Sequence, residues 1–248
     1  MRYFFEITYN GRNYHGWQSQ NNAVGVQAVV EKALRQLVRE HVSIVGSGRT
    51  DTGVHCLQQF FHVDITKPIE PSYLLQRLNS FLPKDIAIRS IRKVKPDASA
   101  RYAATERTYH YHITRVKDPL QEGLSFYFFK PVDLQTLQRA TALLIGMHDF
   151  ECFSKVKTDV DHFLCTIMKA GWTQKGHHLV FSITANRFLR GMVRAVVGTL
   201  LDTGTGKTSL EEFKAILKSR DRKKAGMNVP PDGLFLASVK YPRTIFIK

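Results

Sequence analysis

The sequence predicts an α+β fold made of two ferredoxin-like halves with mixed, mainly antiparallel sheets. Three observations carry this prediction. The chain has 248 residues with 43% hydrophobic content, which suffices for one large core or two small domains. Residues 1–100 alternate strand and helix patterns in the order β-α-β-β-α-β, which is typical of a ferredoxin-like unit. Residues 101–248 repeat the theme with longer connections, so we expect two halves flanking a central cleft that binds the ligand.

The first half is predicted from hydrophobic periodicity and turn signals. A strand rich in β-formers stops at the Asn10-Gly11 turn signal, and the following amphipathic segment has its apolar residues on one helical face. Pro71 suits the first turn of a second helix. The expected elements are strand 2–9, helix 26–38, strands 42–45 and 54–64, helix 71–82 and strand 86–94.

The second half follows the stretch 95–108, which is the best boundary because no low-complexity linker separates the halves. Its first helix is expected to end at Gly146, since glycine is common at helix ends. The expected elements are strands 107–114 and 124–129, helix 132–146, strands 165–173 and 178–185, helices 188–204 and 209–219, and strand 233–241.

The charge of the chain favours a polyanionic partner. Lysine and arginine number 36 against 21 acidic residues, which gives a formal net charge of +15. The basic residues are spread along the chain, so a folded surface carries the charge. Nucleic acid is therefore the leading partner, and a charge that serves solubility alone is the alternative.

The three cysteines, Cys56, Cys152 and Cys165, cannot all pair and show no CxxC spacing. Free thiols in a reducing cytosol fit this pattern best, so we expect a cytoplasmic protein. No apolar run approaches the roughly 18 residues that a membrane-spanning helix needs, so no export or membrane anchor is expected.

Two glycine-rich stretches resemble nucleotide-binding loops and fail on inspection. Residues 203–209, TGTGKTS, follow a helix, and Leu201 occupies the position where a phosphate-binding loop needs glycine. An ATP-dependent RNA enzyme using Gly206 and Lys207 is excluded on this pattern, and a glycine-rich helix exit is predicted. Residues 46–51, GSGRTD, fail the dinucleotide fingerprint because Asp51 occupies its third glycine position.

No metal site is predicted. His110 and His112 share one face of a strand, but no acidic or sulfur partner has recognisable spacing to them. His55 and His62 are interpreted as RNA-facing or packing residues. We expect neither a metal nor a cofactor.

Asp51 lies where the chain is shaped to bend, with Arg49 two residues before it and Gly53 two residues after it. Two interpretations of Asp51 remain open. It either stabilises the turn as a structural aspartate, or it is a reactive carboxylate that the loop holds outside the helices and strands.

The loop GRTDTGVH around Asp51 strongly resembles the signature of the TruA family of tRNA pseudouridine synthases. Further stretches resemble that family's successive blocks in the same order over nearly the whole chain: YNGRNYHGWQSQ, LPKDIAIRSI, ARYAATERTYHY, HDFECFSK, NRFLRGMVRAVVG and GLFLASVKYP. The loop departs from many members at Ser47, Thr52 and Cys56.

The resemblance implies the pseudouridine synthase fold and an isomerase that acts on the anticodon arm of tRNA at positions 38, 39 and 40. It implies a homodimer, no cofactor, and no DNA partner. Carried over, Asp51 is the nucleophile and Arg49 helps to expel or replace the target base. Tyr109 is the active-site tyrosine, Arg194 pairs with the aspartate, and Leu234 packs below the base. Without the resemblance, Arg49 would be interpreted as a simple phosphate contact and Arg194 as an ordinary cation on a helix surface. Tyr109 and Leu234 would be interpreted as ordinary core residues of strands.

The implied chemistry requires these residue types. The glycosidic carbon–nitrogen bond must break, the uracil must turn, and its fifth ring carbon must join the same sugar. Asp51 can attack the sugar, attack the ring, or deprotonate the sugar to give a glycal, and the sequence leaves all three routes open. Arg194 would keep Asp51 ionised, and Tyr109 would stack on the flipped base and help to remove its proton. The rival hypothesis is a noncatalytic RNA-binding protein on the same scaffold.

Overall fold

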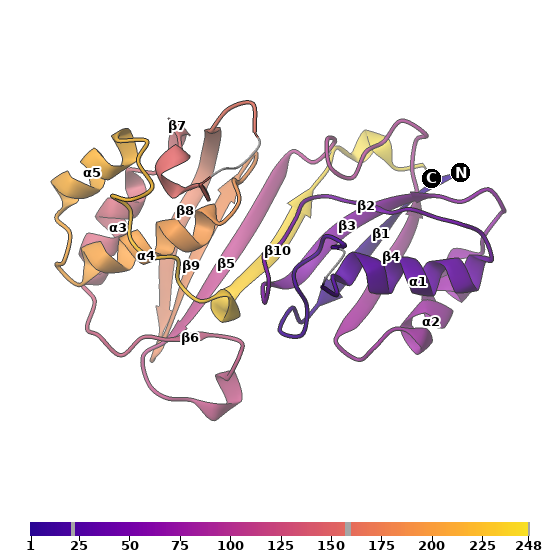
Figure 1. The fold of residues 1–248 in the computed structure, drawn as a ribbon, viewed down its shortest axis with the longest axis horizontal. Coiled ribbons are helices and arrows are strands. Elements are labelled where there is room, and N and C mark those ends of the chain that lie inside the picture. The colour runs from indigo at the N-terminus through magenta and orange to yellow at the C-terminus, as the bar shows by residue number, and fades with distance from the viewer. Residues whose placement is uncertain (21–22, 157–159, 248) are drawn as a thin grey trace. The chain divides into compact units, whose positions relative to one another are not determined.

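The computed structural model describes residues 1–20, 23–156 and 160–247, and its contacts divide the chain into two compact units (Figure 1). Unit 1 comprises residues 1–106 together with the C-terminal segment from residue 235 onward, and unit 2 comprises residues 107–234. Both units combine helices with sheets, so the predicted α+β class is confirmed.

Unit 1 has the strand order of a ferredoxin-like sheet. Its elements are β1 (Arg2–Tyr9), α1 (Val26–Val38), β2 (Val45–Gly46), β3 (His55–Asp64), α2 (Pro71–Phe81), β4 (Ile86–Lys93), β10 (Leu234–Lys240) and the short helix η4 (Arg243–Ile245). Strand β1 lies between β4 and β3, and β2 pairs with β3, all antiparallel, in the order β4-β1-β3-β2. Strand β10 adds a short parallel pairing at the start of β3, so the sheet is mixed.

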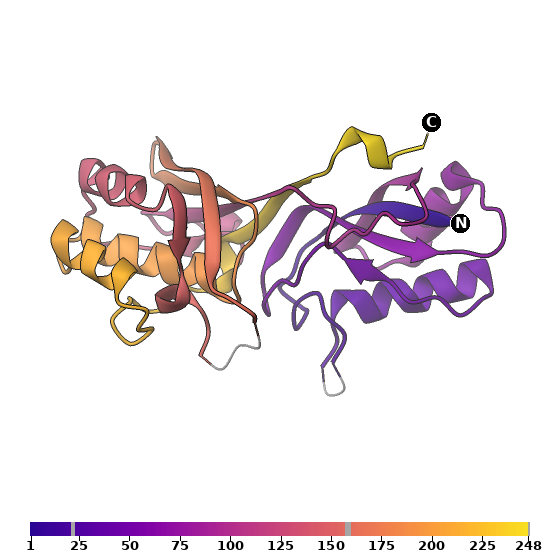
Figure 2. The same ribbon diagram turned by 90° about the horizontal axis from the view of Figure 1, so that it is seen from above.

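Two aromatic clusters fill the faces of this sheet. On one face, the Phe5 and Phe61 rings stack at 5.0 Å, with Trp17 beside Phe61. On the other face, Phe4 contacts the rings of Tyr241 and Phe246, which belong to the C-terminal segment. Figure 2 shows this segment, in yellow, on the side of the sheet away from α1. The chain end therefore completes the second face of unit 1.

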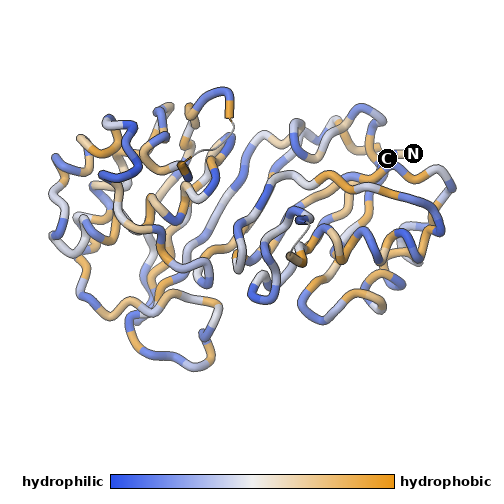
Figure 3. The backbone as a smooth tube through the Cα atoms, viewed as in Figure 1, coloured by the Kyte–Doolittle hydropathy of each residue, from blue (hydrophilic) through white to orange (hydrophobic). Residues whose placement is uncertain are grey.

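Unit 2 is built on an antiparallel ladder of four strands in the order β5-β9-β8-β7, with β6 parallel to β5. Its elements are β5 (Glu106–Thr114), η1 (Pro119–Gln121), β6 (Phe126–Tyr127), α3 (Leu134–Ala142), β7 (Gly146–Asp149), η2 (Glu151–Phe153), β8 (Leu164–Lys175), β9 (His178–Ala185), α4 (Met192–Gly204), α5 (Leu210–Lys218) and η3 (Pro231–Gly233). Every residue of α4 is buried except Arg194 and Asp202, so this helix forms the centre of the core. Along both units, hydrophobic and hydrophilic segments alternate (Figure 3), as expected when each element has one buried face.

Most predicted elements are confirmed, and the differences have local causes. Helix α4 begins at Met192 instead of residue 188, because Gly191 precedes it with a φ of 73°. Helix α3 ends at Ala142, and Gly146, with a φ of 102°, opens the unpredicted strand β7. The strands expected over 42–45 and 124–129 are only two residues each, at 45–46 and 126–127.

The structure also shows where the cysteines, His55, His62 and the TGTGKTS stretch lie. All three cysteines are free, as predicted, and the structure buries all three. His55 and His62 are both buried, so packing is the correct alternative for them. The TGTGKTS stretch is the exit of α4, where Gly206 has a φ of 78° and Lys207 Nζ lies 3.0 Å from Asp202 Oδ2.

No helix in the described parts of the chain combines the length and the apolar character needed to cross a membrane.

Candidate active site

The loop between β2 and β3 holds Asp51 at the first position of a tight turn. The Val54 amide donates to the Asp51 carbonyl oxygen at 3.2 Å, and Gly53, at the third position, has a φ of 78°. A type II turn requires a positive φ at that position, which explains the glycine. The turn uses the main chain of Asp51, and the side chain is half-buried. The carboxylate is therefore not needed for this turn hydrogen bond.

A second segment, residues 9–18, braces this turn by passing very close to it. A Cβ atom on Gly16 would lie 2.2 Å from the Thr50 carbonyl oxygen, and Gly16 itself has a φ of 82°. A Cβ on Gly11 would lie 2.0 Å from the Val54 carbonyl oxygen. The Gly53 amide donates to the Tyr14 carbonyl oxygen at 3.1 Å. Only glycine permits this approach, so both glycines fix the position of the loop.

A buried polar network supports the loop from below. The Tyr9 hydroxyl lies 2.9 Å from Thr50 Oγ1 and donates to Gln59 Oε1 at 3.1 Å. The Gln59 amide in turn donates to the Gly48 carbonyl oxygen at 3.1 Å. Buried hydrogen bonds of this kind are costly to break one at a time, so the network restrains the residues on both sides of Arg49.

The bracing segment is itself anchored to the start of β4. The Tyr14 hydroxyl donates to Asp85 Oδ1 at 2.6 Å, and Asn13 Nδ2 donates to Asp85 Oδ2 at 3.2 Å. Burial, together with the hydrogen bond to Asp85, raises the pKa of Tyr14 above its ordinary value. Tyr14 therefore stays a neutral hydrogen-bond donor at physiological pH.

Arg49 is exposed beside this turn, where its Nε donates to Gln18 Oε1 at 3.0 Å. The partner belongs to the bracing segment, so the same stretch that restrains Asp51 also directs the Arg49 side chain. The guanidinium keeps its remaining donors for other acceptors, which suits contact with RNA.

The remaining predicted site residues lie in unit 2. Tyr109 is half-buried on β5, and its ring meets the Phe188 ring edge-on at 5.0 Å. Leu234, the last residue of unit 2, is buried at the start of β10, directly after η3, and the rest of that strand belongs to unit 1. Arg194 is the third residue of α4, where a cation opposes the helix dipole, so helix stability does not explain its presence.

Arg194 is held by a strap, which we define as residues 225–230. Arg194 Nε donates to the Val229 carbonyl oxygen at 2.7 Å, and the Val229 amide donates back to the Arg194 carbonyl oxygen at 3.3 Å. The buried Tyr111 hydroxyl donates to the Pro230 carbonyl oxygen at 2.8 Å. The strap thus links α4 to β5, the strand that carries Tyr109.

The strap is fixed to α4 at close range and clamped by Arg222. A Cβ on Gly198 would lie 1.9 Å from the Met227 carbonyl oxygen, and the Gly226 amide donates to Thr199 Oγ1 at 2.9 Å. Arg222 donates to the Ala225 and Gly226 carbonyl oxygens at 3.3 and 3.0 Å, and to Asn228 Oδ1 at 3.0 Å. In the sequence, Arg222 is one of several neighbouring basic residues, and nothing in that run distinguishes it as structural.

We expect Arg222→Gln to loosen the strap and to lower about tenfold the single-turnover rate of the tRNA reaction that the sequence resemblance implies, because displacement of a positioned group is costly to catalysis. Unfolding free energy should fall by only about 1–2 kcal/mol, since few hydrogen bonds are lost. Lys223→Gln, which removes the same charge from the exposed neighbouring residue, is the matched control. Equal rates for the two variants would show that the clamp does not position the site.

The structure thus brings Arg49 and Asp51 together in one braced loop of unit 1, and it places Tyr109, Arg194 and Leu234 in unit 2. Within the described ranges, no three side chains of His, Cys, Asp or Glu form a group that could hold a metal ion. Sequence reasoning missed the bracing roles of Gly11 and Gly16.

Comparison with known proteins places this loop and strap in a family. A family model described as tRNA pseudouridine synthase matches residues 7–103 and 140–242. The chain belongs to the tRNA pseudouridine synthase family. The matched ranges contain Arg49, Asp51, Arg194 and Leu234, whereas Tyr109 lies in the stretch between them.

Full-length relatives agree with this assignment. The chain is 47% identical to tRNA pseudouridine synthase A of Porphyromonas gingivalis, covering 99% of both chains. It is 46% identical to the protein of the same name from Parabacteroides distasonis and 44% identical to that from Bacteroides fragilis, in each case covering 99% of this chain and 98% of the relative. The chain therefore resembles these proteins along its whole length.

Proposed function

We propose that this chain is an isomerase that converts uridine to pseudouridine in the anticodon arm of tRNA, at positions 38, 39 and 40, with Asp51 as the catalytic carboxylate. The observation that carries the proposal is the half-buried Asp51 in a turn that two glycines of a separate segment brace. The full-length likeness to proteins named tRNA pseudouridine synthase A supports it.

The reaction needs a charged group beside the sugar and the base, and it needs no redox step or phosphate energy. A carboxylate can act as a covalent nucleophile, as in glycosidases that form a glycosyl-enzyme intermediate. Attack on the sugar, attack on the ring and the glycal route all use the same ionised Asp51. The turn satisfies its main-chain hydrogen bond without the carboxylate, which supports a role in chemistry.

The other site residues divide the remaining tasks. We propose that Arg194 supplies the positive charge that pairs with the carboxylate of Asp51, which serves all three routes. Tyr109 stacks on the base and takes part in removing the proton from its fifth carbon. Leu234 packs below the base, and Arg49 fills the space that the flipped nucleotide leaves in the stem.

Recognition of tRNA follows from charge and shape. The net charge of +15 supplies a grip on phosphates that does not depend on base sequence. We propose that residues 1–100 and 101–248 act as two halves around the target nucleotide, that the enzyme works as a homodimer, and that it acts in the cytoplasm, which suits three free buried thiols. A noncatalytic RNA-binding protein would need neither the braced carboxylate nor the strap-held Arg194.

We expect the purified protein to form pseudouridine in an unmodified tRNA transcript without ATP and with excess chelator, because the proposed route uses only side-chain groups. The measurement is the fraction of uridine converted, read by nucleoside chromatography, with tRNA folding checked in the same buffer. Loss of conversion on chelation, with the tRNA still folded, would contradict the proposed mechanism.

A further inference from the structure

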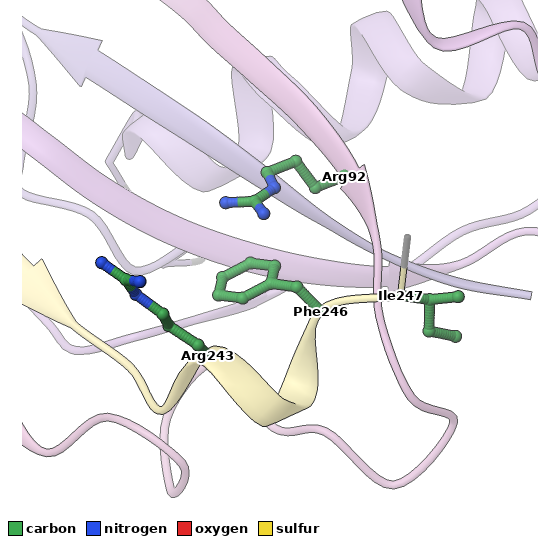
Figure 4. Close-up of a pocket in the computed structure, with 4 residues that line it drawn as sticks. All are labelled: Arg92, Arg243, Phe246 and Ile247. Atoms are coloured by element: carbon green, nitrogen blue, oxygen red, sulfur yellow. The ribbon is translucent and has the colours of Figure 1, made fainter.

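Unit 1 carries a second basic feature that the proposed catalysis does not use. A hollow of about 300 Å³ is lined by Arg92, Arg243, Phe246 and Ile247 (Figure 4). Arg92 comes from β4, and the other three come from η4 and the residues after it. Three of the four lining residues thus belong to the C-terminal segment, which lies on the side of the sheet away from α1 (Figure 2).

The floor of the hollow is an aromatic ring fixed from below. Phe246 meets Phe4 edge-on, with the ring centroids 6.1 Å apart. The guanidinium carbon of Arg92 lies 3.9 Å above the centre of the Phe246 ring, which is cation–π contact. Figure 4 shows the two side chains in this arrangement. The ring restrains the Arg92 side chain, so less conformational entropy is lost when Arg92 binds an anion.

The main chain holds both sides of the hollow together. The Ile247 amide donates to the Lys93 carbonyl oxygen at 3.1 Å, and the Lys95 amide donates to the Ile245 carbonyl oxygen at 2.9 Å. The C-terminal segment therefore runs along the end of β4 as an extra pairing partner. This pairing keeps Arg243 near Arg92, although the two residues are far apart in the sequence.

The hollow carries the positive charges of two arginines. Among the described residues, neither Arg92 nor Arg243 forms an ion pair, whereas Arg2 on the same sheet contacts Asp64 at 2.7 Å. Glu6, the carboxylate on the neighbouring strand, accepts hydrogen bonds from Gln58 and Ser90 instead. Arg92 and Arg243 are exposed, so their donors face solvent.

We infer that this hollow binds a backbone phosphate of the tRNA substrate, at a distance from the target uridine. Two guanidiniums with unused donors match the oxygens of a phosphate, and arginine forms such contacts in two-pronged geometry. Contacts of this kind set the orientation of the nucleic acid without reading its sequence. The inference rests on the proposed function for the identity of the polyanion.

The strand register gives the distance between the hollow and the Asp51 loop. Arg92 pairs with Phe4, and Phe4 pairs with His62, while the Asp51 loop ends at His55, seven residues earlier on β3. At about 3.3 Å per residue, this separation is roughly 23 Å. A base-paired RNA stem that follows the sheet over that distance contains several base pairs. The hollow therefore contacts a part of the tRNA that lies several base pairs from the reacting nucleotide.

The test compares Arg92→Gln, Arg243→Gln and the double variant with Arg77→Gln, which removes the same charge from an exposed position on α2. The probe is an unmodified tRNA transcript, bound at a series of salt concentrations. Each hollow variant should weaken binding about threefold to fivefold, and the double variant about tenfold or more. The salt slope should fall by about 1 in the double variant, because both arginines neutralise the same phosphate. Single-turnover rates at saturating tRNA should stay within about twofold of wild type.

A short hairpin that contains the target uridine and only a few base pairs is the second probe. The double variant should bind this hairpin as tightly as the wild type does, since the hairpin does not reach the hollow. Equal tRNA affinity of the double variant and Arg77→Gln would overturn the inference, as would equal losses for hairpin and full tRNA. These readouts are binding constants, whereas the proposed function is tested by pseudouridine formation, so failure of the one can be told apart from failure of the other.

Discussion

Asp51→Asn is expected to abolish pseudouridine formation, with a loss of about 10⁴-fold or more in the single-turnover rate. An amide has nearly the same size as the carboxylate but is neither a useful nucleophile nor a base. The fold should survive, because the turn hydrogen bond goes to the main-chain oxygen of Asp51 and Gly53 supplies the positive φ. Single-turnover conversion, tRNA binding and thermal unfolding measured on one preparation check the prediction.

Asp118→Asn is the matched control for this variant, since the Asp118 side chain caps η1 by accepting from the Leu120 amide and asparagine caps equally well. It should leave all three readouts near wild type. An Asp51→Asn protein that is folded, binds tRNA and still converts uridine at a similar rate would show that the carboxylate is only structural.

Gly16→Ala is expected to have the second-largest effect, because it attacks the brace instead of the carboxylate. The added Cβ would sit 2.2 Å from the Thr50 carbonyl oxygen, at a residue with a φ of 82°. Either the bracing segment or the Asp51 loop must move. We expect a loss of about 2–4 kcal/mol in unfolding free energy. Activity should fall by about 10²-fold, the typical cost of a displacement near 1 Å at a catalytic group.

Gly206→Ala is the control that introduces the backbone strain of a positive φ without any steric clash of the new Cβ atom. Gly206 has a φ of 78°, but a Cβ there meets nothing within 4 Å. This control should lose only about 1–2 kcal/mol of stability and no activity. If Gly16→Ala behaves like Gly206→Ala in denaturant titration and in turnover, then the bracing segment does not position Asp51.

Local patterns predicted much of this fold. The β-rich run before Asn10-Gly11, the apolar face of α1 and the proline at the start of α2 each depend on neighbours within a few residues, and each prediction is confirmed. The bend at Asp51 could also be predicted, because Gly53 marks the turn type. By contrast, β7 is four residues long with no alternating pattern, so tertiary pairing with β8 defines it.

The contacts that hold the site could not be predicted, because they join residues that are distant in the sequence. Position 16 must be glycine because the Thr50 carbonyl oxygen leaves no room for a Cβ atom, and position 198 must be glycine because of the Met227 carbonyl oxygen. The clamp role of Arg222 depends on where the strap runs and not on its neighbours in the chain. The same is true of Arg243, which lines the same hollow as Arg92 only because the C-terminal segment pairs along β4.

The most direct test of the account is a nucleotide-resolution map of pseudouridine in one unmodified tRNA transcript after incubation with wild-type protein and with Asp51→Asn. The account predicts new pseudouridine at positions 38, 39 or 40, wherever the transcript carries uridine there, in the wild-type sample and none in the variant sample. No pseudouridine with the wild type, modification outside the anticodon arm, or the same map for both proteins would contradict it.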